Sequence, residues 1–106
     1  MARNLVVCCD GTWNSPTQKD RGVNVPSNVV KFARAVRDDT PQVVYYDTGV
    51  GTEQGWDKWT GGALGMGLTQ NIKQAYAWIA ANLQADDRLF LAGFSRGAYT
   101  VRSLGG

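Results

Sequence analysis

The sequence predicts an α/β fold in three layers, with a parallel sheet of three strands between helices. Three short runs are continuously apolar rather than alternating, which is typical of parallel strands that helices cover on both faces. Two segments between these runs repeat apolar residues at helical spacing. Strands and helices therefore alternate along the chain, and this order is characteristic of parallel sheets with right-handed crossovers.

Three strands are predicted, and they are Leu5–Cys9, Val43–Tyr46 and Leu89–Ala92. If the second strand pairs on one side of the first and the third strand on the other, right-handed crossovers place the two connecting helices on opposite faces. This order, 2-1-3, creates a switch point between the first and third strands, where open α/β sheets bind ligands. The order 1-2-3, with both helices on one face, is the alternative.

Three helices are predicted. The first starts at the capping signal Pro26-Ser27-Asn28 and stops near Asp38, before Pro41. Its apolar stripe comprises Val29, Phe32, Ala33 and Val36. The second helix is longer, and its stripe comprises Leu68, Ile72, Ala75, Ile79 and Leu83, with Tyr76 and Trp78 interpreted as packing residues. The third covers Arg96 to Leu104 and ends at Gly105-Gly106.

Composition narrows the possible functions. The chain has 106 residues, 43% of them apolar, which indicates one domain, or part of one, over residues 1–106. Its 11 basic and 9 acidic residues are scattered, so the sequence does not indicate a nucleic-acid partner. No run is apolar enough for a transmembrane segment, and the N-terminus does not resemble a signal peptide. These features predict a cytoplasmic location, with a non-classical route of secretion if the protein is an effector.

The chain contains no histidine. A mechanism that needs imidazole as a general base or as a zinc ligand therefore cannot be completed by these residues alone. The sequence predicts no metal site and no cofactor. Cys8 and Cys9 are adjacent on a predicted strand, so their side chains point to opposite faces, and we interpret them as two buried thiols in a reducing compartment.

The strongest local motif is Gly93-Phe94-Ser95-Arg96-Gly97, which fits G-x-S-x-G between a predicted strand and a predicted helix. A nucleophile elbow has this context, because the tight turn holds its serine in strained geometry above the sheet. Ser95 is the predicted nucleophile, and the Arg96 amide at the helix N-terminus is a predicted oxyanion donor. The alternative is an ordinary turn bounded by glycines.

A second motif, Asp10-Gly11-Thr12-Trp13-Asn14, directly follows the first strand. In the order 2-1-3 this loop lies beside the elbow, so Gly11 or Thr12 would supply the second oxyanion donor. A phosphatase loop is disfavoured, because the position of its attacking aspartate is occupied by Cys8. A turn in which Asp10 caps its own loop is the other interpretation.

Further candidates for loop or substrate contacts lie between the second strand and the second helix. Seven glycines occur from Gly49 to Gly67, but they match no phosphate-binding fingerprint. Trp56 and Trp59 in this segment could face an apolar substrate or pack the loop down. Asp47, after the second strand, could order the loop or orient a catalytic group, whereas Asp38-Asp39 and Asp86-Asp87 are interpreted as solvated turn residues.

Nearly the whole chain resembles the α/β-hydrolase family known as DUF2235, which includes the Tle1-like phospholipase effectors of type VI secretion. The colinear matching stretches are Arg3–Asn14, Asn28–Lys31, Tyr45–Thr52, Gly61–Leu68, Asn71-Ile72, Ala75-Tyr76 and Gly93–Thr100. The resemblance implies that Ser95 is the nucleophile of a serine hydrolase acting on carboxylic esters or phospholipids. It also implies that the catalytic aspartate and histidine follow the serine.

Because neither catalytic partner can be assigned in this chain, we expect it to be the N-terminal part of a longer hydrolase domain and to be inactive alone. Its expected partners are an ester or phospholipid substrate and the remainder of the domain, or another chain, across the sheet edges. A non-catalytic binding or assembly module that pairs with another chain is the alternative, because three parallel strands leave two open edges.

Overall fold

The computed structural model of the chain contains one parallel sheet of three strands. It describes residues 3–11, 19–36, 41–48 and 63–106, with side chains from residue 67 in the last range. The strands are β1 (Asn4–Cys9), β4 (Gln42–Asp47) and β5 (Arg88–Gly93), in the order β4-β1-β5. The predicted strands and their order 2-1-3 are therefore confirmed, and each strand is one or two residues longer than predicted.

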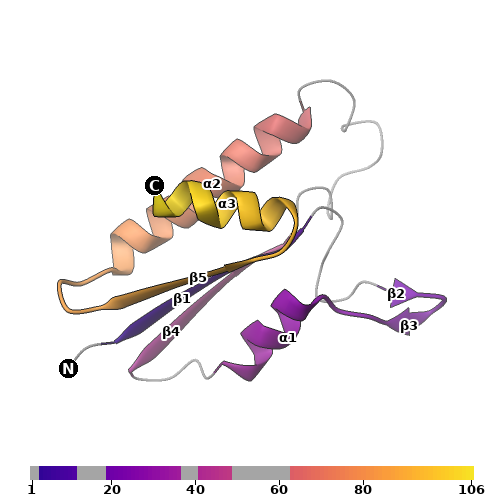
Figure 1. The fold of residues 1–106 in the computed structure, drawn as a ribbon, viewed down its shortest axis with the longest axis horizontal. Helices are drawn as coiled ribbons and strands as arrows, with labels where there is room; N and C mark the ends of the chain where they lie inside the picture. The colour runs from indigo at the N-terminus through magenta and orange to yellow at the C-terminus, as the bar shows by residue number, and fades with distance from the viewer. Residues whose placement is uncertain (1–2, 12–18, 37–40, 49–62) are drawn as a thin grey trace.

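Helices cover both faces of this sheet (Figure 1). On one face lies α1 (Asn28–Ala35), and on the other lie α2 (Ala63–Asn82) and α3 (Arg96–Gly105). Successive side chains of β1 enter opposite cores: Val7 and Cys9 join the cluster under α2 and α3, whereas Val6 and Cys8 join the cluster under α1. The three predicted layers are present, and β1 is central and buried.

The helices partly follow their predicted stripes. Ser27 caps α1 by accepting a hydrogen bond from the Val30 amide at 3.3 Å, as the start signal predicts. The helix ends at Ala35, three residues earlier than expected, and Phe32 is 45% exposed whereas Val30 is buried. Val29, Ala33 and Val36 of the predicted stripe pack against the sheet, so only Phe32 departs from it.

The long helix α2 packs through Ala75 and Ile79, which are buried, and through Trp78. The Trp78 ring lies against Tyr45 of β4, with ring centroids 5.1 Å apart, so its packing role is confirmed. The packing interpretation of Tyr76 is wrong, because this side chain is 65% exposed. Leu83, just after α2, is also exposed, so the stripe contacts the sheet only through its middle.

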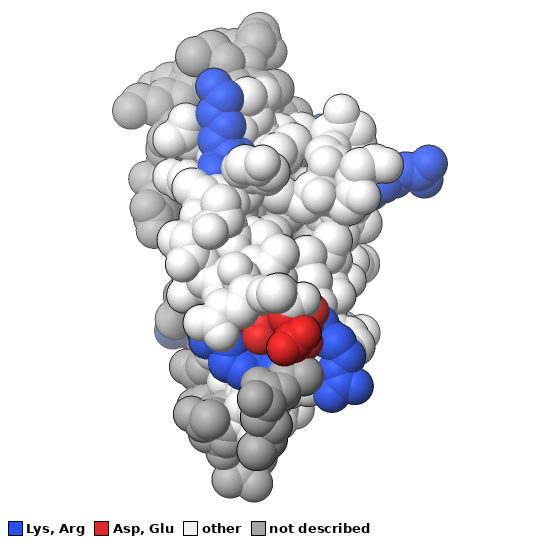
Figure 2. All heavy atoms as spheres, turned by 90° about the vertical axis from the view of Figure 1, so that its left-hand side faces the viewer, with Lys and Arg blue, Asp and Glu red and all other residues white. Residues whose placement is uncertain are grey.

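The amino ends of the strands are joined by an ion pair that the sequence interpretation missed. Arg3 Nη2 lies 2.8 Å from Asp87 Oδ2, and the Asp87 side chain is only 2% exposed. Asp87 is therefore not a solvated turn residue; hydrogen bonds with Arg3 lower its pKa to about 2. Figure 2 views this end of the molecule, where acidic side chains gather between basic ones and much of the described surface is uncharged.

Two further features complete the described fold. A small hairpin of β2 (Lys19–Asp20) and β3 (Val23–Asn24) was not predicted; its turn residues Arg21 and Gly22 both have positive φ, at 51° and 82°. Such a turn favours glycine and joins two short antiparallel strands directly. Within the described ranges, no helix is long and apolar enough to cross a membrane.

Candidate active site

A tight turn joins β5 to α3, and Ser95 stands at its apex. The strand ends at Gly93 and the helix begins at Arg96, so only Phe94 and Ser95 connect them. Ser95 has φ 55° and ψ −122°, a conformation that residues with a side chain rarely adopt. Holding a residue in such a region costs about 1–3 kcal/mol and occurs where the surrounding structure fixes it.

The two flanking glycines are explained by close approaches of backbone. A Cβ on Gly97 would overlap the carbonyl group of Cys9, at the end of β1. A Cβ on Gly93 would overlap the Gly97 carbonyl and would lie 2.7 Å from the Ala98 nitrogen. Both positions therefore exclude any side chain. The first turn of α3 sits directly on the ends of β1 and β5 because these two Cβ atoms are missing.

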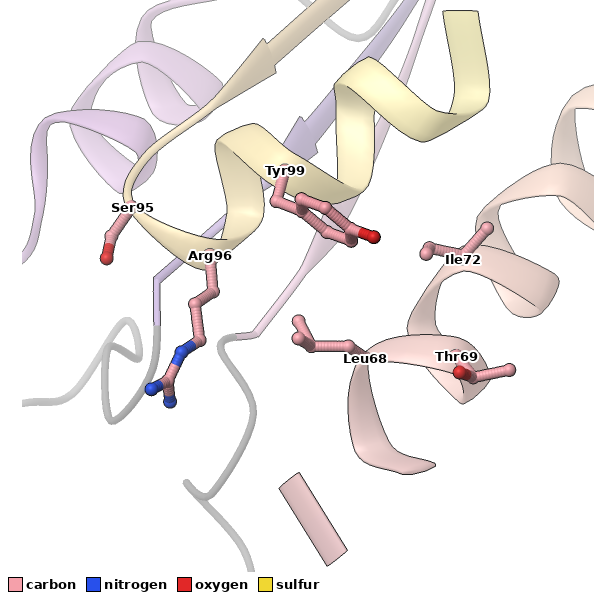
Figure 3. Close-up of a pocket in the computed structure, with 6 residues that line it drawn as sticks. All are labelled: Leu68, Thr69, Ile72, Ser95, Arg96 and Tyr99. Atoms are coloured by element: carbon pink, nitrogen blue, oxygen red, sulfur yellow. The ribbon is translucent and has the colours of Figure 1, made fainter. Parts of the chain in front are cut away.

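The Ser95 side chain is exposed and is not used to cap its own helix. It occupies the N-cap position of α3, yet its hydroxyl makes no capping hydrogen bond. Serine at an N-cap commonly accepts a hydrogen bond from the second or third amide of the helix. Here the unusual backbone conformation turns the hydroxyl away, toward the open side of the turn (Figure 3).

The same turn lies beside the loop that follows β1. The Phe94 amide donates to the Cys9 carbonyl at 3.2 Å, which joins the turn to the residue before Asp10. The strand order thus brings four predicted site residues to one edge of the sheet, as expected: Ser95, Arg96, Asp10 and Gly11. Of the remaining predicted site residues, Thr12, Trp56 and Trp59 lie outside the described residues.

Asp10 is the centre of a buried hydrogen-bond cluster. Its side chain accepts from the Tyr46 hydroxyl at 2.7 Å, and the Ser27 hydroxyl lies 2.8 Å from each of its oxygens. The residue is only 4% exposed. Because Ser27 also caps α1, this one carboxylate connects the end of β1, the start of α1 and β4. A buried carboxylate needs such donors to offset its lost hydration.

Asp10 also accepts a hydrogen bond from the Gly11 amide, at 2.9 Å. The interpretation of this segment as a turn capped by Asp10 stays a prediction, because the residues from Thr12 onward lie outside the described ranges. In this conformation the Gly11 amide is directed at Asp10 and is already engaged. Sequence reasoning singled out Asp10 but missed Ser27 and Tyr46 as its partners, although the capping signal at Ser27 was visible.

Asp47, the last residue of β4, is the second carboxylate at this edge. It pairs with Cys9 in the parallel register, and its carbonyl accepts from the Asp10 amide at 3.0 Å. Its Oδ2 is buried and has no hydrogen-bond partner among the described residues. Burial raises the pKa of Asp47 from 3.8 to about 6, against a smaller lowering by a hydrogen bond with Tyr45.

The two cysteines are free and buried, as predicted. Burial raises the pKa of both thiols, that of Cys9 to about 12, so neither resembles an activated nucleophile. Among the residues that the structure describes, no three cysteine, aspartate or glutamate side chains cluster in a way that could hold a metal ion.

A cavity of about 550 Å³ opens beside Ser95, between the first turns of α3 and the amino-terminal half of α2. Its lining residues are Leu68, Thr69, Ile72, Ser95, Arg96 and Tyr99. In Figure 3 the side chains of Leu68 and Ile72 point toward Tyr99, whereas Thr69 points away from it. Sequence reasoning assigned Leu68 and Ile72 to the packing stripe of the helix and did not single out Tyr99.

Comparisons with known proteins identify the family of the chain. The chain is 26% identical over 121 aligned positions to the uncharacterized protein YEL023C of Saccharomyces cerevisiae, a match that covers 98% of this chain and 17% of the yeast protein. The chain thus spans about a sixth of the length of that relative. No solved structure matches the chain significantly. Residues 3–106 match the family described as "T6SS, Phospholipase effector Tle1-like, catalytic domain", and the chain belongs to this family.

Proposed function

We propose that Ser95 is the nucleophile of a hydrolase that cleaves carboxylic esters of lipids. The observation that carries the proposal is the strained backbone of Ser95, held between β5 and α3 with its hydroxyl outside any cap. In the proposed reaction the Ser95 oxygen bonds to the ester carbonyl carbon, and its proton passes to a general base. The alcohol then leaves with a proton, and water releases the acyl group from the serine.

Charge that develops on the carbonyl oxygen needs donors that are already in position. The Arg96 amide begins α3 directly after Ser95, where the helix dipole favours negative charge. The second donor comes from the loop that follows β1, from Gly11 or Thr12. Because the Gly11 amide already donates to Asp10, Thr12 is the better of the two.

The proposed general base is a histidine outside these residues, since the sequence contains none. On this proposal, residues 1–106 are the N-terminal part of one hydrolase domain, and the 106-residue chain does not turn over substrate alone. Assayed with p-nitrophenyl esters, it is expected to give the same rate as its Ser95→Ala variant. A clearly faster, serine-dependent rate would show that the base lies within the chain.

The family membership supports a phospholipid as substrate and delivery through type VI secretion. Asp47, Trp56 and Trp59 are proposed as loop or substrate contacts around the same edge of the sheet. Asp47 fits this role through its buried oxygen, for which the described residues provide no donor. A donor from a substrate or from another segment would satisfy this oxygen and favour the ionised carboxylate.

A reactive probe tests Ser95 without requiring turnover. An alkyl fluorophosphonate forms a bond from phosphorus to the serine oxygen and releases fluoride and a proton, and mild alkali replaces the missing base. Ser103, exposed on the same helix, is a matched control. We expect Ser95 to be modified at least about tenfold faster than Ser103, as mapped by mass spectrometry, because the α3 amide stabilises the charge that develops on the phosphoryl oxygen in the transition state. Equal rates, or no adduct at Ser95, would exclude the proposed role.

A non-catalytic assembly module is the second candidate, and β5 favours it. Among the described strands β5 pairs only with β1, so its other edge is open. Leu89 and Phe90 on this strand are 37% and 48% exposed, which is unusual for an apolar strand of a parallel sheet. Sedimentation and urea denaturation test this candidate: a cooperative, stable monomer would count against an obligate partner at this edge.

A further inference from the structure

The cavity beside Ser95 has an apolar side and a polar side. Leu68 and Ile72 of α2 and the ring of Tyr99 on α3 form the apolar side, and Ser95 and Arg96 lie at the amino end of α3. Tyr99 is 60% exposed, so a large aromatic surface faces this space rather than the core. The cavity volume of about 550 Å³ lies within the range of small-molecule sites, about 300–1,000 Å³.

The helical positions explain why these side chains meet. Leu68 and Ile72 are four residues apart and share one face of α2, whereas Ala75 and Ile79 continue that helix into the buried core. Ser95 and Tyr99 are likewise four residues apart, at the start of α3. An apolar strip therefore starts beside the serine and runs along the space between the two helices.

We infer that this strip is the binding site for the acyl chain of the substrate, with Leu68, Ile72 and Tyr99 as its specificity-determining side chains. The inference rests on the proposed function of Ser95, and it adds where the acyl chain of the substrate binds. An ester whose carbonyl carbon is at Ser95 directs its acyl chain along this apolar strip, because the strip and the serine line the same cavity. The polar part of the ester then stays near Arg96 and the open edge of the sheet.

Binding of a fatty acid tests the inference without catalysis. The probe is cis-parinarate, whose fluorescence rises in an apolar site, titrated into the 106-residue chain. Leu68→Arg introduces a charge into the strip, and we expect the dissociation constant to rise about tenfold or more. Leu83→Arg is the matched control: the same change just beyond the other end of α2, at a residue that is 45% exposed. We expect it to bind like the unmodified chain.

A second variant guards against a folding defect. Ile72→Trp fills the strip with an apolar side chain, so it is expected to weaken parinarate binding while the circular dichroism spectrum stays unchanged. Unaltered affinity in both Leu68→Arg and Ile72→Trp, or equal losses in Leu68→Arg and Leu83→Arg, would overturn the inference. Absence of parinarate binding by the unmodified chain would overturn it as well.

The Ser95→Ala variant separates this inference from the proposed chemistry. It is expected to bind parinarate with the affinity of the unmodified chain, because the methylene groups contact α2 and Tyr99 rather than the hydroxyl. Suppose that Ser95 is not modified by the fluorophosphonate but that Leu68→Arg still weakens parinarate binding. The strip is then an acyl-chain site without the proposed nucleophile. If Ser95 reacts but parinarate binding is insensitive to Leu68→Arg, the nucleophile stands and the acyl site lies elsewhere.

Discussion

Two carboxylates at the carboxyl edge of the sheet have opposite surroundings. Asp10 follows β1 and accepts hydrogen bonds from two hydroxyl groups and one amide. Asp47 ends the neighbouring strand, and one of its oxygens is buried without a donor among the described residues. Tyr46 reaches Asp10 from the α1 side of the sheet, whereas Tyr45, on the α2 side, interacts with Asp47.

The different hydrogen bonding of the two carboxylates indicates different roles, one structural and one functional. Asp10 holds three parts of the fold together, so its contribution is structural. The buried Asp47 oxygen has no hydrogen-bond donor in the described structure, so its desolvation lowers the stability of the fold. Polar groups that are left unsatisfied in this way are typical of functional positions. The comparison can be tested by removing each carboxylate, or one of its donors, and measuring the free energy of unfolding.

The largest effect is expected for Asp10→Ala. The change leaves the hydroxyls of Ser27 and Tyr46 and the Gly11 amide without their acceptor, so the free energy of unfolding should fall by about 3 kcal/mol. Urea denaturation measures it, with Asp86→Ala, at an exposed turn, as the control that stays within about 0.5 kcal/mol. A loss under about 1 kcal/mol would show that Asp10 is not the structural centre described above.

A pH-dependent effect is expected for Asp47→Asn. The pKa of this carboxyl is raised from 3.8 to about 6, so the folded state holds its proton more tightly than the unfolded state. Its contribution to stability is complete below about pH 4 and is lost as the pH rises through about 6. Relative to the unmodified chain, Asp47→Asn should therefore gain about 2 kcal/mol between about pH 4 and about pH 7.

The measurement is a series of urea titrations at several pH values, with Asp86→Asn as the matched control at an exposed carboxylate. Asp86→Asn, a surface substitution, is expected to change the free energy of unfolding by no more than about 0.5 kcal/mol. If the stability difference between Asp47→Asn and the unmodified chain does not change with pH, burial does not raise the pKa of Asp47. That result would also remove the contrast with Asp10.

The smallest of the three effects is expected for Tyr46→Phe. This variant removes only the hydroxyl that donates to Asp10 at 2.7 Å and keeps the ring in the α1-side cluster. Loss of one hydrogen bond to a charged group should lower the free energy of unfolding by about 1.5 kcal/mol. Tyr76→Phe, at a residue that is 65% exposed, is the control and should be neutral. Equal effects in the two variants would show that the Tyr46 hydroxyl adds nothing to the cluster.

The fold and the apex of the site were predictable because their signals are local. Continuous apolar runs specify buried parallel strands, and the glycines around Ser95 specify a turn where backbone segments touch. The structure confirms the strand order and the layers, and it places Ser95 and Arg96 beside the loop after β1. The role of Ser95 as a nucleophile remains a proposal.

What could not be predicted depends on contacts between distant residues. Ser27 and Tyr46 are 17 and 36 positions from Asp10, and no spacing rule connects them. Arg3 and Asp87 are 84 positions apart, so the salt bridge that removes Asp87 from solvent leaves no local pattern. The exposure of Phe32 and Tyr76 depends on which helical positions the neighbouring elements cover, and apolar periodicity alone does not specify this.

The adjacent thiols of β1 allow local opening of the helical layer on each face of the sheet to be measured separately. Cys8 is enclosed by the α1 layer and Cys9 by the α2–α3 layer, and each is 3% exposed or less. A thiol reagent can reach either sulfur only after the corresponding layer has opened, so its rate reports the local opening equilibrium of that layer. Single-cysteine variants that retain one thiol each would therefore show which layer opens more often: the α2–α3 layer next to Ser95, or the α1 layer that the Asp10 hydrogen bonds stabilise.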